Sequence, residues 1–270
     1  QNRFLAQIDY VYPIDENTQF ELGYRGRKVD RETDYDVSYL TSIQCVTTPC
    51  EDIYQSDPRL SNIFAYEEFV NAFYSQYGKK VDKLSFLLGL RFEGSKQEID
   101  QRTTNQFEIK KYSDWFPTLN LAYEFSKMES ITFGYSKRIR RPRGWNINPF
   151  PRRSSVTSVR RGNPFLDPTF TNSLEIGYLK RLEKFTINGE IFYSNSKNNS
   201  VRVTEETGEL VTVTGGRDDE SNPTLQVPVL ESYPINLSEN TRFGAVLNLT
   251  YTPSRSVRLN ASFTLNDNKQ

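Results

Sequence analysis

The residue types that usually carry chemistry are scarce in this chain. Its 270 residues include no histidine and only two cysteines. Imidazole-based acid–base catalysis and imidazole metal ligation are therefore excluded, and two thiolates are too few for a closed structural zinc site. The carboxylate pairs Glu67–Glu68 and Asp218–Asp219 are adjacent in sequence, so in strands their side chains would point to opposite faces. We therefore expect neither an enzyme nor a bound cofactor or metal.

The two cysteines lie five residues apart, in the segment Cys45-Val-Thr-Thr-Pro-Cys50. This segment is rich in turn-forming residues and belongs to a long polar stretch. A disulfide between Cys45 and Cys50 would clamp one loop in an oxidising compartment. The alternative is two free thiols in a cytosolic loop. We favour the disulfide, because a chain with only two cysteines has placed both in one loop.

Arginines gather around a single segment of the chain. They are Arg138, Arg140, Arg141, Arg143, Arg152, Arg153, Arg160 and Arg161. A guanidinium group suits bidentate contacts with carboxylate or phosphate. Five of these residues are thus candidate contacts for an anionic ligand or for the phosphates of lipopolysaccharide: Arg138, Arg140, Arg143, Arg152 and Arg153. The alternative, which we favour, is that they pair with acidic residues elsewhere in the protein.

Composition narrows the class of protein. The 34 basic residues equal the 34 acidic ones, whereas nucleic-acid binders usually carry a basic excess, so we expect no nucleic-acid partner. The mean hydropathy is −0.66, and no run approaches the roughly 18 apolar residues of a membrane-spanning helix. These values fit a soluble β-protein, and they fit a membrane β-barrel equally well because only alternate residues of its strands touch lipid.

Alternation of apolar and polar residues recurs along almost the whole chain. In one clear case the odd positions 243–251 read Phe, Ala, Leu, Leu and Tyr, whereas the even positions 242–250 read Arg, Gly, Val, Asn and Thr. Such a strand needs lipid or a core on one side and water on the other. The pattern predicts about ten strands, near residues 3–12, 18–27, 62–77, 83–97, 112–125, 130–141, 170–182, 185–203, 240–252 and 256–267.

The predicted connections alternate between short and long. Tight turns join the two strands of each successive pair, and aromatic residues such as Tyr12, Tyr77, Tyr123 and Tyr251 flank them. The long connections cover residues 28–61, 98–111, 142–169 and 204–239. All tight turns would then lie at one end of the sheet, as in outer-membrane barrels with short periplasmic turns, long extracellular loops and aromatic girdles. A soluble sandwich is the alternative, but its strands average about 5–6 residues.

The last long connection, 204–239, contains a run of acidic residues. Residues 215–222 of the last one, Gly-Gly-Arg-Asp-Asp-Glu-Ser-Asn, are acidic, but they lack the regular spacing of an EF-hand calcium loop. We interpret 204–239 as a solvated, mobile loop.

In 142–169, Gly162-Asn163-Pro164 is a turn signal, because Gly and Asn tolerate positive φ and Pro fixes the φ that follows. We expect these three residues to be structural and to direct the chain back into a strand.

Two segments resemble a known family. The first is Tyr135-Ser-Lys-Arg-Ile-Arg-Arg-Pro142 with Trp145-Asn-Ile-Asn-Pro-Phe150, and the second is Gly162-Asn-Pro-Phe-Leu-Asp-Pro168 with Asn172-Ser-Leu-Glu-Ile-Gly-Tyr178. Together they resemble the barrel of TonB-dependent receptors, most closely the outer-membrane β-barrel family common in Bacteroidetes. Lys137 and Thr169 depart from the usual pattern without affecting the architecture. The resemblance is strongest over 112–265.

The resemblance implies an all-β, antiparallel transmembrane barrel of about 22 strands, plugged by an N-terminal domain. Residues 1–270 would then be a segment of the barrel wall, about ten strands of the larger barrel, within a longer protein. A complete ten-stranded barrel is the competing interpretation. In this setting Arg138 and Arg140, on even positions, would face the lumen, where acidic residues of the plug or of neighbouring strands are possible partners.

The function implied is TonB-coupled uptake of a ligand across the bacterial outer membrane. Outer-membrane lipid, lipopolysaccharide and the TonB complex, reached through the plug, are the expected partners. A passive, porin-like channel is one alternative, and a structural or adhesive barrel within a larger envelope complex is another. An upstream plug domain would separate uptake from passive diffusion, and co-purifying subunits would support the third hypothesis.

Overall fold

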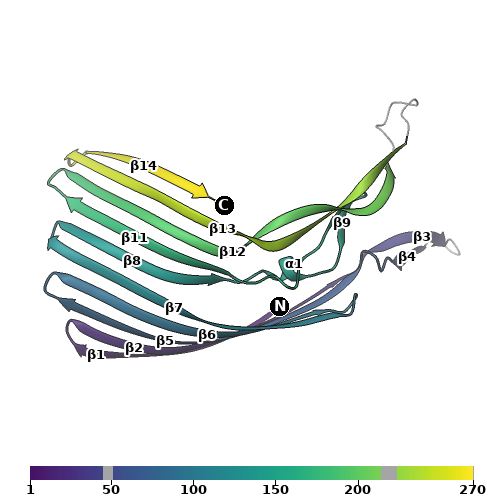
Figure 1. Ribbon diagram of the computed structural model, residues 1–270, viewed down its shortest axis with the longest axis horizontal. Coiled ribbons are helices and arrows are strands. Elements are labelled where there is room, and N and C mark those ends of the chain that lie inside the picture. The colour runs from purple at the N-terminus through teal and green to yellow at the C-terminus, as the bar shows by residue number, and fades with distance from the viewer. Residues whose placement is uncertain (45–50, 214–223, 270) are drawn as a thin grey trace.

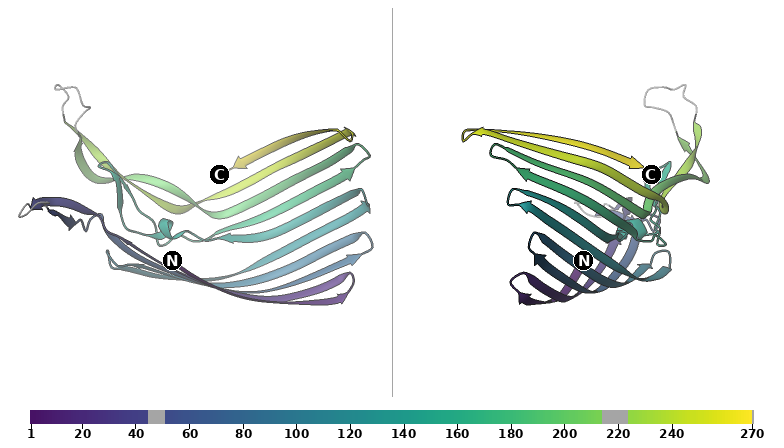
Figure 2. Two further views of the ribbon diagram at one scale, coloured as in Figure 1. Left: turned by 180° about the vertical axis from the view of Figure 1, so that it is seen from behind. Right: turned by 60° about the vertical axis from the view of Figure 1, so that its left-hand side comes forward.

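The computed structural model describes residues 1–44, 51–213 and 224–269. The ten predicted strands are all present, and each pairs with the next in antiparallel register to form one curved sheet (Figures 1 and 2). In chain order they are β1 (Asn2–Asp15), β2 (Thr18–Tyr35), β5 (Asn62–Val81), β6 (Leu84–Gln101), β7 (Gln106–Ser126), β8 (Glu129–Arg140), β11 (Thr169–Arg181), β12 (Phe185–Val213), β13 (Leu225–Ser254) and β14 (Val257–Lys269). Strands β1 and β14 are the two edges of this sheet.

Five smaller elements lie between the wall strands. β3 (Ser38–Gln44) and β4 (Glu51–Ser56) pair as a hairpin between β2 and β5. The single-turn helix α1 (Gly144–Ile147), β9 (Arg152–Ser155) and β10 (Ser158–Arg160) lie between β8 and β11, and β10 pairs in parallel with residues 230–232 of β13. In the described part of the chain, no helix has the length and apolarity needed to cross a membrane.

The two faces of the sheet differ as the alternation predicts. On β6 the residues at 84, 86, 88, 90 and 92 are Leu, Phe, Leu, Leu and Phe, and they point to one face, here called the outer face. The residues between them point to the inner face, which carries the buried Glu93 and Gln97. The outward run covers about 27 Å along the strand, close to the roughly 25 Å apolar band of outer-membrane barrels once the strand is tilted. The outer face therefore fits a lipid environment.

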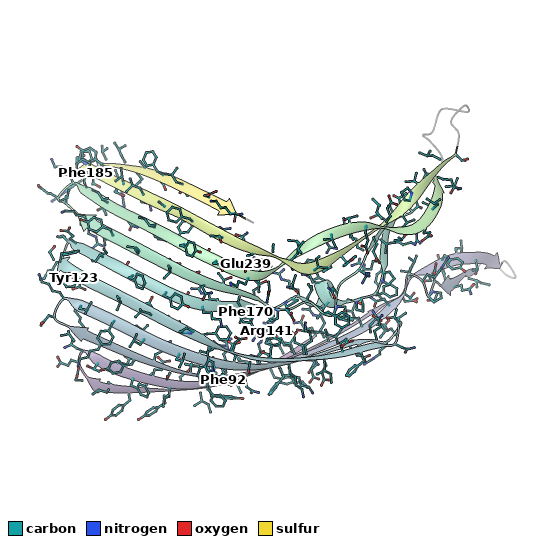
Figure 3. The ribbon with its side chains drawn as sticks, viewed as in Figure 1. Phe92, Tyr123, Arg141, Phe170, Phe185 and Glu239 are labelled. Atoms are coloured by element: carbon teal, nitrogen blue, oxygen red, sulfur yellow. The ribbon has the colours of Figure 1, made fainter. Side chains whose placement is uncertain are left out.

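Aromatic side chains border this apolar band at both of its ends along the strands. The tight turns of two or three residues lie at one end of the sheet (Figure 1). Beside them Tyr123 packs edge-on against Phe125 at 5.0 Å and Phe185 stacks on Tyr251 at 4.3 Å between ring centroids. At the other level Phe92 contacts Trp115 at 4.9 Å (Figure 3). Two aromatic rows separated by aliphatic side chains are the arrangement of membrane-interface girdles.

The strands extend further beyond the second aromatic row than predicted. β6 and β7 are joined by residues 102–105 alone, so the prediction of a long connection over 98–111 was wrong. β2 continues to residue 35, and β12 and β13 pair within most of 204–239, where we predicted a loop. In this region both faces carry charge: Lys28 pairs with Glu67 at 3.1 Å on the outer face. Where the outer face carries charged side chains and the inner face buries polar ones such as Glu68 and Gln97, the apolar–polar alternation that identifies a strand in the sequence disappears.

Candidate functional site

Residues 141–168, here called the inner segment, fold back over the inner face of the wall. Ile147 and Leu166 of this segment are each 1% exposed, and they form one buried cluster with side chains of β5 and β6. The wall members of this cluster are Phe64, Tyr66 and Ile99. The predicted long connection over 142–169 is thus present, but it is packed against the wall.

The Gly162-Asn163 bend closes the inner segment on itself. The backbone N–H of Gly162 donates to the carbonyl of Asn148 at 2.7 Å, and the N–H of Asn163 donates to that of Asn146 at 2.7 Å. Neither Gly162 nor Asn163 has a positive φ, so the reason we gave for this turn was wrong. Glycine is required at 162 because a Cβ there would lie 2.6 Å from the carbonyl oxygen of Asn148.

Side chains far away in the sequence hold the end of the inner segment. The Asn163 amide donates to the carbonyl of Pro234 at 3.0 Å, and the Asn236 side chain accepts from the N–H of Asp167 at 2.7 Å. The Lys110 ammonium donates to the carbonyls of Phe165 and Leu166 and pairs with Asp167 at 2.8 Å. Sequence reasoning missed Lys110 and Asn236, because no local pattern shows that β7 and β13 meet this bend.

A buried polar cluster anchors the start of the inner segment. Arg141 donates to Glu93 at 2.6 Å and to Ser95 at 2.7 Å, and its guanidinium lies 5.6 Å from the Tyr112 ring centroid (Figure 3). The side chains of Arg141 and Glu93 are 14% and 8% exposed. Arg91 pairs with the same carboxylate. The chain therefore leaves β8 from a fixed point on the inner face.

The five arginines predicted to contact an anion do not form one site. Arg138 lines an inner-face hollow of about 460 Å³ together with Arg25 and Arg91. Arg140 makes a 3.4 Å contact with Asn199, Arg143 is exposed just before α1, and Arg153 pairs with Glu209 at 2.8 Å. Arg152 lies elsewhere, in the pocket described next.

Five arginines converge on a pocket of about 280 Å³, here called the arginine pocket. They are Arg31 of β2, Arg152 of β9, Arg160 of β10, Arg161 directly after β10, and Arg202 of β12. Trp145 and Phe150 of the inner segment also line it. Arg161 pairs with Glu231 at 2.9 Å and lies over the Tyr233 ring at 4.3 Å. Among the residues that the structure describes, the other four arginines have no acidic partner within 4.0 Å.

Residues far apart in the sequence meet in this pocket. Arg31 lies on the part of β2 that we predicted as a connection, and Arg202 lies on β12 one position before its predicted end. The cluster of arginines seen in the sequence included Arg152, Arg160 and Arg161. It could not include Arg31, about 120 positions before Arg152, or Arg202, about 40 positions after Arg161. Within the described residues no group of histidine, cysteine or carboxylate side chains has the arrangement of a metal site. The pocket is suited to anions.

The whole chain, residues 1–270, matches the outer membrane protein beta-barrel family. The chain belongs to this family. The curved sheet with its apolar outer face is accordingly part of a transmembrane β-barrel wall in the bacterial outer membrane, which confirms the predicted fold class and localisation. No curated protein sequence matches the chain.

Solved structures of three transporters share this fold. The chain is similar to the FrpB iron transporter of Neisseria meningitidis (F3-3 variant), with a TM-score of 0.60, 10% identity, and coverage of 97% of this chain and 35% of that one. It is similar to the copper transporter OprC, with a TM-score of 0.63, 12% identity, and coverage of 99% of this chain and 37% of that one. It is also similar to the unliganded ferric citrate transporter FecA, with a TM-score of 0.59, 12% identity, and coverage of 99% and 35%. The chain thus spans about a third of the length of these three transporters, which share its fold.

Proposed function

We propose that these residues form part of the wall of a receptor that takes up a ligand across the outer membrane by TonB-coupled transport. The observation that carries the proposal is the similarity of nearly the whole chain to the barrels of iron and copper transporters. Under this proposal the wall is part of a barrel of about 22 strands. A plug domain outside residues 1–270 fills the lumen and transmits the pull of TonB.

The proposed orientation follows from the two ends of the sheet. The tight turns face the periplasm, and the connections within 28–61, 98–111, 142–169 and 204–239 face the cell exterior, because barrels insert with short turns on the periplasmic side. The inner segment and the arginine pocket lie beyond the second aromatic row, toward the extracellular end. A ligand arriving from outside would therefore meet them before it met the plug.

Two measurements on the purified full-length protein test TonB coupling. We expect the protein to retain the periplasmic C-terminal domain of TonB in a pull-down, and to show little conductance in a planar bilayer because the lumen is plugged. Steady conductance without TonB binding would replace the proposal with a passive channel. Stoichiometric co-purification of other envelope proteins, again without TonB binding, would replace it with a structural subunit.

A further inference from the structure

We propose that the arginine pocket binds a compact soluble ligand carrying two or more carboxylate or phosphate groups. This inference rests on the proposed function and specifies the ligand class. It differs from the expectation drawn from sequence, because only Arg152 belongs to both sets of residues. Arg31, Arg160, Arg161 and Arg202 complete the pocket.

The charge of the pocket is the first argument. Five arginines line a space of about 280 Å³, and one described carboxylate, Glu231, is paired with one of them. Like charges held together in a concave site repel one another, and such a site attracts counter-ions strongly. The remaining positive charge is best neutralised by a ligand with several negative charges. A single carboxylate carries one negative charge and would leave most of this positive charge uncompensated.

The rigidity of the pocket is the second argument. Arg161 is fixed between Glu231 and the Tyr233 ring, and Arg202 donates to the carbonyl of Ser232 at 3.2 Å. Arg31 donates to the Gln1 side chain at 2.8 Å. Arg152 and Arg160 belong to two paired strands of the inner segment. Three of the five guanidinium groups, those of Arg31, Arg161 and Arg202, are thus already held by hydrogen bonds or an ion pair. A group that is held in place loses less entropy on binding, which favours a specific site over a diffuse basic surface.

The position of the pocket selects a soluble ligand over lipid. Its wall residues Arg31, Thr33 and Phe64 lie on the inner face, opposite the apolar outer face. Arg31 follows Tyr24, an outer-face residue beside Phe73, by seven residues, or about 23 Å along the strand. Lipopolysaccharide phosphates lie at the membrane surface around the outside of a barrel. The pocket instead opens to the space that a solute must cross.

The size and lining of the pocket limit the ligand further. A volume of about 280 Å³ is near the lower end of the range for small-molecule sites, about 300–1,000 Å³. Trp145 is 60% exposed at its rim, so a planar or apolar part of the ligand can pack on the indole ring. Small di- and tricarboxylates, pyrophosphate, or a larger molecule that inserts such a group satisfy these limits.

Calorimetric titration of the detergent-solubilised full-length protein tests the proposal, with citrate and pyrophosphate as probes and acetate as the single-charge control. We expect saturable binding of at least one multivalent probe and none of acetate. The double variant Arg152→Gln/Arg160→Gln should weaken binding by about tenfold or more, because each substitution removes charge-assisted hydrogen bonds to the ligand. Arg143→Gln, an exposed arginine of the same segment outside the pocket, should bind normally.

A folding control and three other outcomes complete the test. Heat-modifiable migration on a gel verifies that the variants are folded. No saturable binding of either multivalent probe would overturn the inference, as would equal affinity in the Arg152/Arg160 variant and in Arg143→Gln. Loss of co-purifying lipopolysaccharide in the double variant, without probe binding in the parent, would assign the pocket to lipid phosphates. Because this binding needs no TonB, failure of TonB coupling would be detected separately, in the pull-down.

Discussion

Arginine at position 247 is expected to lower the free energy of unfolding of the full-length protein by about 2–4 kcal/mol, measured by denaturant titration in lipid bilayers. Leu247 lies midway along the outward run from Phe243 to Tyr251 of β13, and it is 39% exposed. At this level the side chain contacts the hydrocarbon interior of the bilayer. A guanidinium group placed there must lose its hydration or distort the membrane.

The matched control is arginine at the neighbouring position. Asn248 points to the inner face, where its side chain accepts from the Ser262 hydroxyl at 2.8 Å. Asn248→Arg should change the free energy of unfolding by less than about 1 kcal/mol, because the new charge remains in a polar, hydrated lumen. Equal destabilisation by the two substitutions would mean that the faces of β13 do not meet different solvents.

Methionine at position 141 is expected to lower the free energy of unfolding by about 3 kcal/mol. Arg141 is the ionic link between the start of the inner segment and the wall, and its loss leaves the carboxylate of Glu93 buried with Arg91 as its remaining ionic partner. Removing one member of a buried pair typically costs about 3–5 kcal/mol, and the partner that remains places the effect at the lower end. The inner segment should also become more sensitive to trypsin at Arg152 and Arg153.

Arg140→Met provides the control for this experiment. Arg140 precedes Arg141 by one residue, is exposed, and makes one 3.4 Å contact with Asn199. Its replacement should change the free energy of unfolding by less than about 0.5 kcal/mol and leave trypsin sensitivity unchanged. If Arg141→Met had as little effect as Arg140→Met, the buried polar cluster would not be what fixes the inner segment.

The sequence predicted the part of the fold that lies in the membrane. Between the two aromatic rows every outward position must be apolar, so residues such as Leu88 and Leu247 repeat with the period of a strand. Beyond Phe92 the outward residues of β6 include Lys96 and Glu98, which pair with each other. Lipid does not require apolar side chains at these outward positions, and the inward positions include the buried polar residue Gln97. The strand there is maintained by hydrogen bonds to its neighbours, which no local pattern reveals.

The candidate site was predictable only in part, for a related reason. Arg152 could be recognised as a candidate anion contact because the arginines around it are close in sequence. Arg31 and Arg202 join it through strand pairing over long sequence separations, which a single sequence does not encode locally. Gly162 was recognised as a turn residue, but the close approach of Asn148 that requires glycine depends on the folded inner segment. Cys45 and Cys50 lie outside the described residues, and their disulfide stays a prediction.

Site-directed spin labelling across residues 243–251 tests the central claim, that one face of this sheet contacts lipid and the other lines a lumen. The full-length protein, with serine at positions 45 and 50 and one new cysteine at a time, would be labelled in lipid bilayers. Collision rates with oxygen, which partitions into lipid, should be high at the odd positions and low at the even ones. Collision rates with a water-soluble nickel complex should be lowest at the odd positions. Uniform rates along the segment, or nickel contact at 245, 247 and 249, would contradict the barrel wall and the inner-face site built on it.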